Sequence, residues 1–221
     1  MDFKLIRIFL LVFLSSLIAK NLPNDIKWVV KSDEYKMICE QTYMIAWEKL
    51  HSEIHSSELS YKLAVVMDLD ETVLDNSDYQ IDYLVQNNTS YTPDSWDQWV
   101  LEERARLVPG SKNFILELKK HDVQIIYISN RMEKRLEETK SNMKKLGILF
   151  GDEIFLLRKD SADKKTIRRQ AVYDNSNRIG ASGPYKVIAY FGDAMGDFPE
   201  SDKIRFGKNQ FIFPNPMYGK W

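Results

Sequence analysis

The chain has 221 residues, with 32 acidic and 31 basic side chains and a formal net charge of -1 at pH 7. Neither sign of charge is concentrated in one segment, which excludes a nucleic-acid groove or a polybasic membrane patch and favours a small-molecule partner over a nucleic-acid polymer. The length fits one substantial α/β domain with its own core.

The N-terminal segment has the pattern of an export signal. Two basic residues precede the apolar run Ile8 to Leu14, and small residues follow up to Ala19. The run is too short for a comfortable membrane span, so we expect a signal peptide over residues 1–19. A retained anchor is the alternative, because Leu17 is a poor residue two places before the cleavage site. Either way, residues 20–221 are expected to be exported (periplasmic, cell-surface or secreted), without stable membrane insertion beyond the leader.

Apolar residues recur at helical spacing between Ser32 and Ile54, and Ser32 supplies an N-cap, so we expect one or two packed helices. Cys39 lies in this pattern and is expected to be buried; as the single cysteine it excludes an intramolecular disulfide. His51 and His55 stand four residues apart, a spacing that can hold zinc on a helix. The glutamate between them is not where a metalloprotease needs it, so we interpret the pair as a solvated helix face.

Leu63 to Met67 is a short apolar run rich in β-branched residues, typical of a buried parallel strand. Residues 76–106 are instead aromatic and polar, with a break at Thr92-Pro93-Asp94. We expect this second segment to be a mainly helical, cap-like excursion beside the core. Together with residues 20–60 it would contribute the smaller helical part of a single domain.

Helices and apolar strands alternate through the rest of the chain. The sequence predicts helices over residues 111–119, 133–146 and 164–172, and strands over 123–128, 153–157, 187–191 and 210–213. We expect Ser111 to cap the first of these helices, and we interpret Arg168 and Arg169 as exposed helix charges. The alternation predicts an α/β fold, a Rossmann-like parallel sheet with helices on both faces that binds ligands at the carboxyl ends of its strands.

Acidic side chains follow the first predicted strand. Asp68 and Asp70 stand two positions apart at its end, where the chain turns, so both can reach one phosphate. A carboxylate facing a divalent cation stays ionised and can attack phosphorus, while a second carboxyl exchanges a proton with the leaving oxygen and with water. The pair therefore indicates phosphate ester hydrolysis.

Other strand and helix ends supply the remaining groups that phosphoryl transfer needs. Ser129 offers a hydroxyl and a backbone N–H, and Lys164 or Lys165 offers an ammonium at the start of a helix. Asp193 and Asp197 offer carboxylates for a hard divalent ion. Each residue alone has an ordinary alternative as a cap, turn or surface charge; their order and setting favour the functional interpretation.

Four short motifs thus follow one another: Asp68-Leu69-Asp70-Glu71-Thr72, Ile128-Ser129-Asn130-Arg131, the Lys164-Lys165 region, and Gly192-Asp193 through Asp197-Phe198. In this order they resemble the motifs of the haloacid dehalogenase (HAD) superfamily, and within it the class C non-specific acid phosphatases. Residues 75–77, 85–88, 108–110 and 214–221, with Trp96 and Trp99, extend the resemblance from about Trp28 to the C-terminus.

The resemblance implies a HAD-type fold and an exported, Mg²⁺-dependent acid phosphatase that works through an aspartyl-phosphate. Asp68 would be the nucleophile and a metal ligand, and Asp70 the general acid/base with its backbone carbonyl on the metal. Asp193 would be a metal ligand, and Asp197 a ligand or the support of one. Ser129, Asn130 and a lysine would bind the phosphoryl group. The family register favours Lys164 over Lys165 without deciding between these neighbours.

Several class C enzymes prefer nucleoside 5′-monophosphates, whose bases stack on aromatic side chains. Tyr83 and Tyr218 are the candidates for substrate binding here, although Tyr83 lies in a segment one residue longer than the family pattern and is equally well an ordinary half-buried tyrosine. Other open alternatives are a phosphotransferase or phosphomutase, a catalytically idle surface binding protein on the same scaffold, and a homodimer. The leader has no lipobox cysteine, and the segment from Asp197 to Pro214 is shorter than in better-known relatives.

Overall fold

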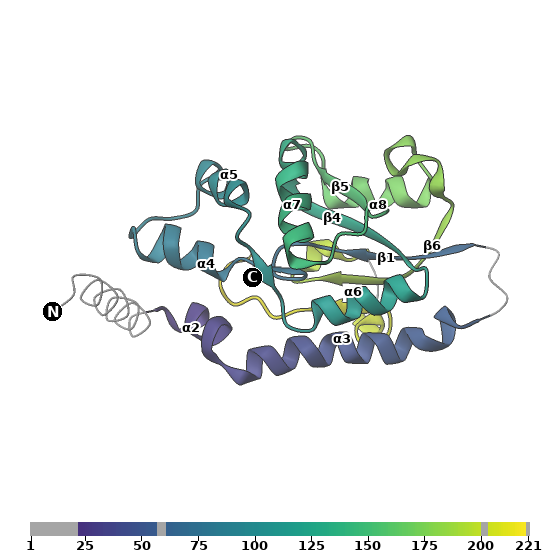
Figure 1. Ribbon diagram of the computed structural model, residues 1–221, viewed down its shortest axis with the longest axis horizontal. Coiled ribbons are helices and arrows are strands. Elements are labelled where there is room, and N and C mark those ends of the chain that lie inside the picture. The colour runs from purple at the N-terminus through teal and green to yellow at the C-terminus, as the bar shows by residue number, and fades with distance from the viewer. Residues whose placement is uncertain (1–21, 57–60, 200–202, 220–221) are drawn as a thin grey trace.

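The computed structural model describes residues 22–56, 61–199 and 203–219 (Figure 1). The expected signal peptide over residues 1–19 lies outside these ranges. Among the described helices, none has the length and apolar character needed to cross a membrane.

The core of the molecule is a five-stranded sheet in which every neighbouring pair is parallel, in the order β5-β4-β1-β6-β7. The strands are β1 (Lys62–Met67), β4 (Gln124–Met132), β5 (Ile154–Arg158), β6 (Tyr185–Gly192) and β7 (Gln210–Ile212). Their nearly continuous apolar runs follow from burial on both faces. The sequence prediction of these five strands is confirmed, and β4 is longer than expected because it continues through the polar residues Ser129 to Arg131.

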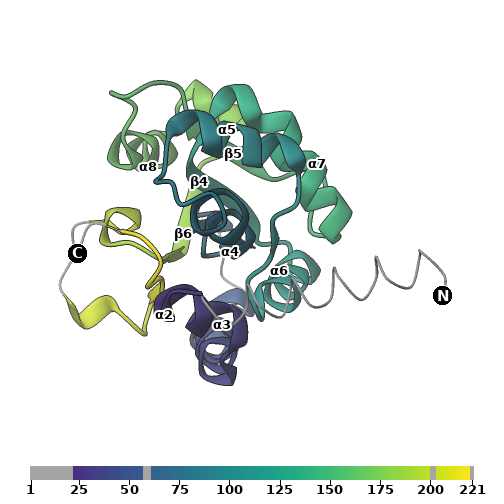
Figure 2. The same cartoon turned by 90° about the vertical axis from the view of Figure 1, so that its left-hand side faces the viewer.

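Helices cover both faces of the sheet, as Figures 1 and 2 show. Alternate residues of β1 point to opposite sides, so Val65 and Met67 pack in one apolar cluster and Ala64 and Val66 in the other. The first cluster lies against α3 (Asp33–Ile54), α6 (Ser111–Lys120) and α7 (Leu136–Leu146), and the second against α8 (Lys165–Tyr173) and η3 (Asn177–Ser182). This is the Rossmann-like parallel sheet with helices on both faces that the sequence predicted.

A short helix, α2 (Asn24–Lys31), precedes α3, whose N-cap is Ser32 as expected: its side chain accepts a hydrogen bond from the Tyr35 N–H at 3.0 Å. Cys39 is fully buried in α3, and burial raises the pKa of its thiol to about 12. This cysteine is therefore a small core residue without thiolate chemistry.

The excursion between β1 and α6 is mainly helical, as predicted. It contains α4 (Ser77–Tyr79), the π-helical turn η1 (Gln80–Val85) and α5 (Pro93–Glu102). A two-stranded antiparallel ladder of β2 (Leu74–Asp75) and β3 (Arg106–Leu107), which the sequence analysis missed, joins the two ends of the excursion. An aromatic cluster in which Trp96 and Trp99 pack on Tyr79 holds its helices together.

Two expectations for the helices were wrong. Gly110, with φ 85°, is the N-cap of α6, and Ser111 is the first helical residue, because the close approach of α3 leaves room only for a glycine in a left-handed turn. Arg168 and Arg169 are buried, at 0% and 5% exposure, because they lie on the face of α8 that packs against the sheet and η4 (Met195–Asp197). Periodicity places these two guanidinium groups on a helix, but only the fold shows which side meets the sheet.

Candidate active site

The candidate site lies at the point in the sheet where the strand order reverses. Strands β4 and β5 lie on one side of β1, and the later strands β6 and β7 lie on the other side. The carboxyl ends of β4, β1 and β6 therefore lie together at one edge of the sheet, which is the position where open α/β sheets bind ligands. These ends carry Ser129, Asp68 and Asp193.

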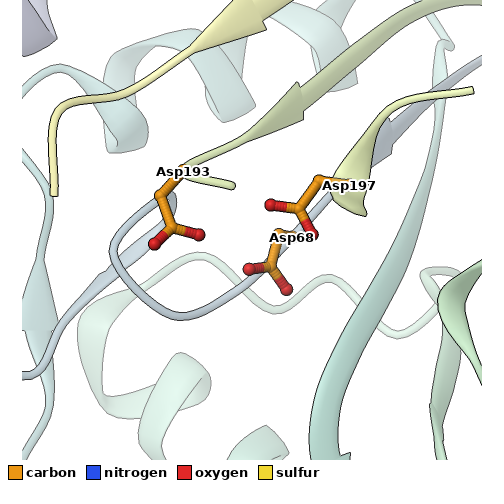
Figure 3. A group of neighbouring side chains, drawn as sticks. All are labelled: Asp68, Asp193 and Asp197. Carbon is orange, nitrogen blue, oxygen red and sulfur yellow. The ribbon is translucent and has the colours of Figure 1, made fainter. Parts of the chain in front are cut away.

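Three carboxylates meet at this edge, from Asp68, Asp193 and Asp197 (Figure 3). One oxygen from each lies within 4.8 Å of the others. The backbone N–H of Asp68 donates to the Phe191 carbonyl at 2.9 Å, which ties the end of β1 to β6. Asp197 packs directly against Gly192 at the end of β6. A side chain at position 192 would place its Cβ 2.3 Å from the Cβ of Asp197, so a glycine is required there.

The lysine that reaches this cluster is Lys165. Its ammonium lies 2.7 Å from Asp68 Oδ1 and also pairs with Asp197. Lys164, which the family register favoured, is instead the N-cap of α8 with an exposed side chain. The two lysines differ because α8 begins at Lys165. The exact first residue of the helix determines which lysine side chain points toward the strand ends, and the sequence did not predict that residue.

The electrostatics of the cluster show a shortage of positive charge. Burial raises the pKa of Asp68 well above its ordinary value, an effect opposed by Lys165 and reinforced by Asp197 and Asp193. Burial and the charge of Asp197 raise the pKa of Asp193 to about 6. Burial lowers the pKa of Lys165, but the charges of Asp68 and Asp197 outweigh this and raise it overall. Among the described residues one ammonium pairs with this group of three carboxylates, which does not balance their charge. An all-oxygen donor set of this kind fits a hard divalent cation such as Mg²⁺.

Asp70 has a different environment, although it is only two residues from Asp68. Its Oδ1 accepts hydrogen bonds from Arg131 Nε at 2.9 Å and Asn76 Nδ2 at 3.0 Å, and lies 2.8 Å from Arg131 Nη2. Its Oδ2 accepts a long hydrogen bond from the Ser129 hydroxyl, at 3.4 Å. Arg131 is 2% exposed and also contacts Thr139, so the guanidinium is fixed and holds one carboxylate oxygen while leaving the other available.

The remaining predicted phosphate-binding groups are side chains at the end of β4. Ser129 is fully buried, and its hydroxyl accepts the Arg131 N–H at 3.2 Å. The side-chain oxygen of exposed Asn130 accepts from Arg168 Nη2 at 2.8 Å, while Arg168 Nη1 donates to the Ser129 carbonyl. Arg168, on α8, therefore holds residues 129 and 130 in place through these two hydrogen bonds. The sequence did not predict this role or those of Arg131 and Asn76, although Arg131 stands within the second motif and Asn76 within the 75–77 segment of the family resemblance.

The two candidate substrate-binding tyrosines differ in their connection to the site. Tyr218 is 37% exposed, and its N–H donates at 3.4 Å to Asn215 Oδ1; the other end of that amide donates to Asp193 Oδ2 at 2.7 Å. Tyr83 belongs to the aromatic cluster of the excursion: its ring lies edge-on to Trp99 and its hydroxyl bonds to Glu102. Only Tyr218 is thus tied to a carboxylate of the cluster through one side chain.

Comparison with known families finds a match over residues 14–221 to the model described as HAD superfamily, subfamily IIIB (Acid phosphatase). Among individual proteins, the chain is 25% identical over 188 residues to the stem 31 kDa glycoprotein of Glycine max. That match spans 83% of this chain and 66% of the relative. It is 26% identical over 155 residues to vegetative storage protein 1 of Arabidopsis thaliana, which spans 69% of this chain and 54% of the relative. The chain thus covers about two thirds or less of these plant proteins.

Solved structures give a closer match. A class C acid phosphatase from Bacillus anthracis with tungstate bound shares 30% sequence identity and a TM-score of 0.77, over 92% of this chain and 86% of that one. A second structure of the class C acid phosphatase from Bacillus anthracis gives 31% identity and a TM-score of 0.76 over the same shares of the two chains.

Proposed function

The chain belongs to subfamily IIIB of the HAD superfamily, the acid phosphatases, and on that premise we propose that it is an exported, Mg²⁺-dependent phosphomonoesterase acting through an aspartyl-phosphate on Asp68. The observation that carries this proposal is the division of charge at the end of β1. Asp68 lies among carboxylates with one lysine, whereas Asp70 lies against a fixed arginine.

In the proposed reaction, an oxygen of ionised Asp68 attacks phosphorus and the ester P–O bond breaks. The leaving oxygen takes a proton from Asp70, whose lightly bonded Oδ2 is the available atom. Asp70 then accepts a proton from the water that attacks the aspartyl-phosphate, which releases inorganic phosphate and restores both carboxyl groups. Both half-reactions need Asp70 to exchange a proton and Asp68 to stay ionised.

Bound Mg²⁺, held by Asp68, Asp193 and Asp197 with the backbone carbonyl of Asp70, would supply positive charge next to the transferring phosphoryl group. The protein's own donors complete that environment. The Lys165 ammonium already contacts Asp68, and the Ser129 hydroxyl and the Asn130 amide lie at the neighbouring strand end. Such fixed donors stabilise the developing charge without reorganisation during the reaction. The class C acid phosphatase from Bacillus anthracis has been solved with tungstate bound. Tungstate is a tetrahedral oxyanion like phosphate, which supports a phosphate-binding function for this chain.

Two finer elements of the proposal concern place and substrate. Export is supported by the basic and apolar leader and by the glycoprotein name of the soybean relative, because glycosylation acts on secreted chains. A preference for nucleoside 5′-monophosphates would use the exposed side chain of Tyr218, whose backbone N–H is linked to Asp193 through the Asn215 amide. Turnover of nucleotides, sugar phosphates and phosphotyrosine by one preparation, with and without Mg²⁺, would identify the preferred class.

The decisive experiment is Asp68→Asn. We expect it to lower turnover of a generic aryl phosphate in Mg²⁺ by about 10⁴-fold or more, as loss of a covalent nucleophile does in other hydrolases. The matched control is Asp33→Asn, an exposed first-turn acid of α3, which should leave activity unchanged. Wild-type turnover in Asp68→Asn would contradict the proposal.

Two other functions use the same scaffold and can be separated in the same assays. A phosphotransferase would transfer the phosphoryl group to an added alcohol in preference to water, so free phosphate and phosphorylated alcohol are measured together. A catalytically idle binding protein, suggested by the storage-protein name of one plant relative, would show no Mg²⁺-dependent turnover in the wild type. The presence of Asp68, Asp70 and Lys165 together in the site favours hydrolysis.

A further inference from the structure

All three histidines of the chain meet at one place on the surface. His51 lies on the last turn of α3, His55 is the C-cap of α3, and His121 is the C-cap of α6. The ring centroids of His51 and His55 are 4.0 Å apart and those of His55 and His121 4.6 Å apart. The sequence showed only the pair on one helix; the fold adds the third imidazole from a neighbouring helix.

This cluster lies far from the candidate active site. His121 stands three residues before the start of β4, so it lies near the amino-end edge of the sheet, whereas Asp68 and Ser129 lie at the carboxyl-end edge. Figure 1 shows the end of α3 and the start of β1 at the side of the molecule opposite the cap-like excursion. Any ligand bound by these imidazoles is therefore separate from the phosphate site.

The hydrogen bond of His55 prepares one nitrogen for a ligand. His55 Nδ1 lies 2.7 Å from the His51 carbonyl oxygen. A carbonyl can only accept, so Nδ1 carries the proton and Nε2 of the neutral ring keeps a free lone pair. Histidines that bind metals are typically oriented in this way, with the second ring nitrogen donating to a carbonyl or carboxylate. Trp47 packs against both His51 and His121, with centroids 6.1 and 5.3 Å away, and restricts their rings from one side.

We propose that His51, His55 and His121 form a second metal site, specific for a late first-row divalent ion such as Zn²⁺, Cu²⁺ or Ni²⁺. Three imidazole nitrogens are the ligands these ions prefer, in contrast to the all-oxygen set of the carboxylate cluster. Among the described residues, three candidate ligand atoms lie within 4.8 Å of one another only in that carboxylate group. The three rings are therefore near one another without converged nitrogens, and metal binding would turn the exposed rings of His51 and His121 toward Nε2 of His55, which keeps its hydrogen bond.

The test is Zn²⁺ binding by untagged full-length protein, measured by isothermal calorimetry at neutral pH. Because Zn²⁺ can also bind carboxylates, the Asp193→Asn background is used throughout. We expect about one equivalent of Zn²⁺ to bind at the histidines, by analogy with three-histidine zinc sites. His121→Gln should weaken that binding by at least about tenfold, and His51→Gln by a similar factor, since even loss of an outer-shell partner has such an effect.

The matched control is Lys49→Gln, an exposed substitution on the same helix, which should bind Zn²⁺ as the background does. Cu²⁺ gives an independent readout, since its electron paramagnetic resonance spectrum shows nitrogen hyperfine structure when imidazoles are ligands, and this structure should be lost in the double variant His51→Gln/His121→Gln. All of these side chains are exposed, so the variants should melt at the temperature of the background without metal. Unchanged Zn²⁺ affinity in both His51→Gln and His121→Gln would overturn the proposal.

Discussion

Asp68 and Asp70 are separated by one residue, yet they lie in regions of opposite electrostatic character. Around Asp68 there are two further carboxylates and one lysine. Around Asp70 there are the guanidinium of Arg131 and the amide of Asn76, which both donate to its Oδ1. The carboxylates around Asp68 need a further cation to offset their charge, whereas Asp70 already has a cationic partner in Arg131.

This difference comes from the backbone that follows the strand. The Glu71 N–H donates to the Leu74 carbonyl at 2.8 Å and Glu71 itself is left-handed, with φ 55°, so the chain turns away from the sheet directly after Asp70. The buried Glu71 carboxylate accepts the Asn76 N–H at 2.9 Å and holds that turn closed. A left-handed non-glycine residue costs about 1–3 kcal/mol, and such strain persists where the surroundings over-determine it. Two equal side chains are thus directed to two different environments.

The largest expected effect that sharpens this comparison is on the Asp68 side. Lys165→Gln removes the one ammonium that contacts both Asp68 and Asp197. We expect kcat to fall by about 10²–10³-fold, the range observed when one preorganised donor to a transition state is lost. Mg²⁺ affinity should not fall, because the carboxylates lose a competing cation. Steady-state kinetics with a Mg²⁺ titration measures both quantities.

Lys164→Gln is the matched control for this experiment. Lys164 adjoins Lys165 in sequence but caps α8 with its side chain exposed. Its replacement should change kcat by less than about twofold, since surface charges contribute little. If Lys164→Gln had the larger effect, the family register would be right and the assignment of Lys165 wrong.

A second prediction concerns the pH dependence of stability in metal-free protein. In the folded state the pKa of Asp193 is raised to about 6 by burial and by Asp197. The folded state therefore holds this proton more tightly than the unfolded chain. The resulting stabilisation is present at low pH and is lost as the pH rises through about 6. The free energy of unfolding in EDTA should fall by up to about 3 kcal/mol between pH 4 and pH 7 through this residue, at 1.36 kcal/mol for each unit of pKa shift.

Denaturant unfolding at several pH values measures this effect, and two comparisons isolate it. Asp193→Asn should reduce the dependence of the unfolding free energy on pH. Saturating Mg²⁺ should reduce that dependence further, because the cation favours all three ionised carboxylates. Asp97 and Asp163, whose folded-state pKa values are held at about 2 by hydrogen bonds from Arg135 and Arg178, contribute stability that is complete above about pH 5 and rises with pH below it, so they do not produce the predicted fall. A slope that Mg²⁺ leaves unchanged would show that the cluster does not bind the ion.

The sequence predicted the sheet and the acidic strand end because both depend on local pattern. Apolar β-branched runs give buried parallel strands, and parallel strands bring their carboxyl ends together, so Asp68, Ser129 and Asp193 were expected at one edge. The family resemblance then supplied their roles. Identification of the cluster required nothing beyond the order of the motifs.

The charged side chains that support the site could not be predicted in this way. Arg131 contacts Asp70 from β4, and Arg168 contacts Asn130 from α8, and both contacts depend on which face of an element meets the sheet. An arginine on a helix is usually exposed, so Arg168 was expected at the surface although it is fully buried. The choice between Lys164 and Lys165 depended on a single residue at a helix start, where pattern-based boundaries are least certain.

The smallest expected effect, and the one that tests the Asp70 side directly, is that of Arg131→Gln. The guanidinium fixes Oδ1 of Asp70, so its loss leaves the proton-exchanging group present but poorly oriented. We expect kcat to fall by about 10–100-fold, less than the full 10²–10⁴-fold value of general acid catalysis. The loss should be greater for alkyl phosphates than for nitrophenyl phosphate, because a poor leaving group needs the proton more. Arg135→Gln, which breaks a pair with Asp97 outside the site, should reduce both substrates equally and slightly. An equal loss on both substrates in Arg131→Gln would mean that Arg131 supports the fold and not the proton transfer.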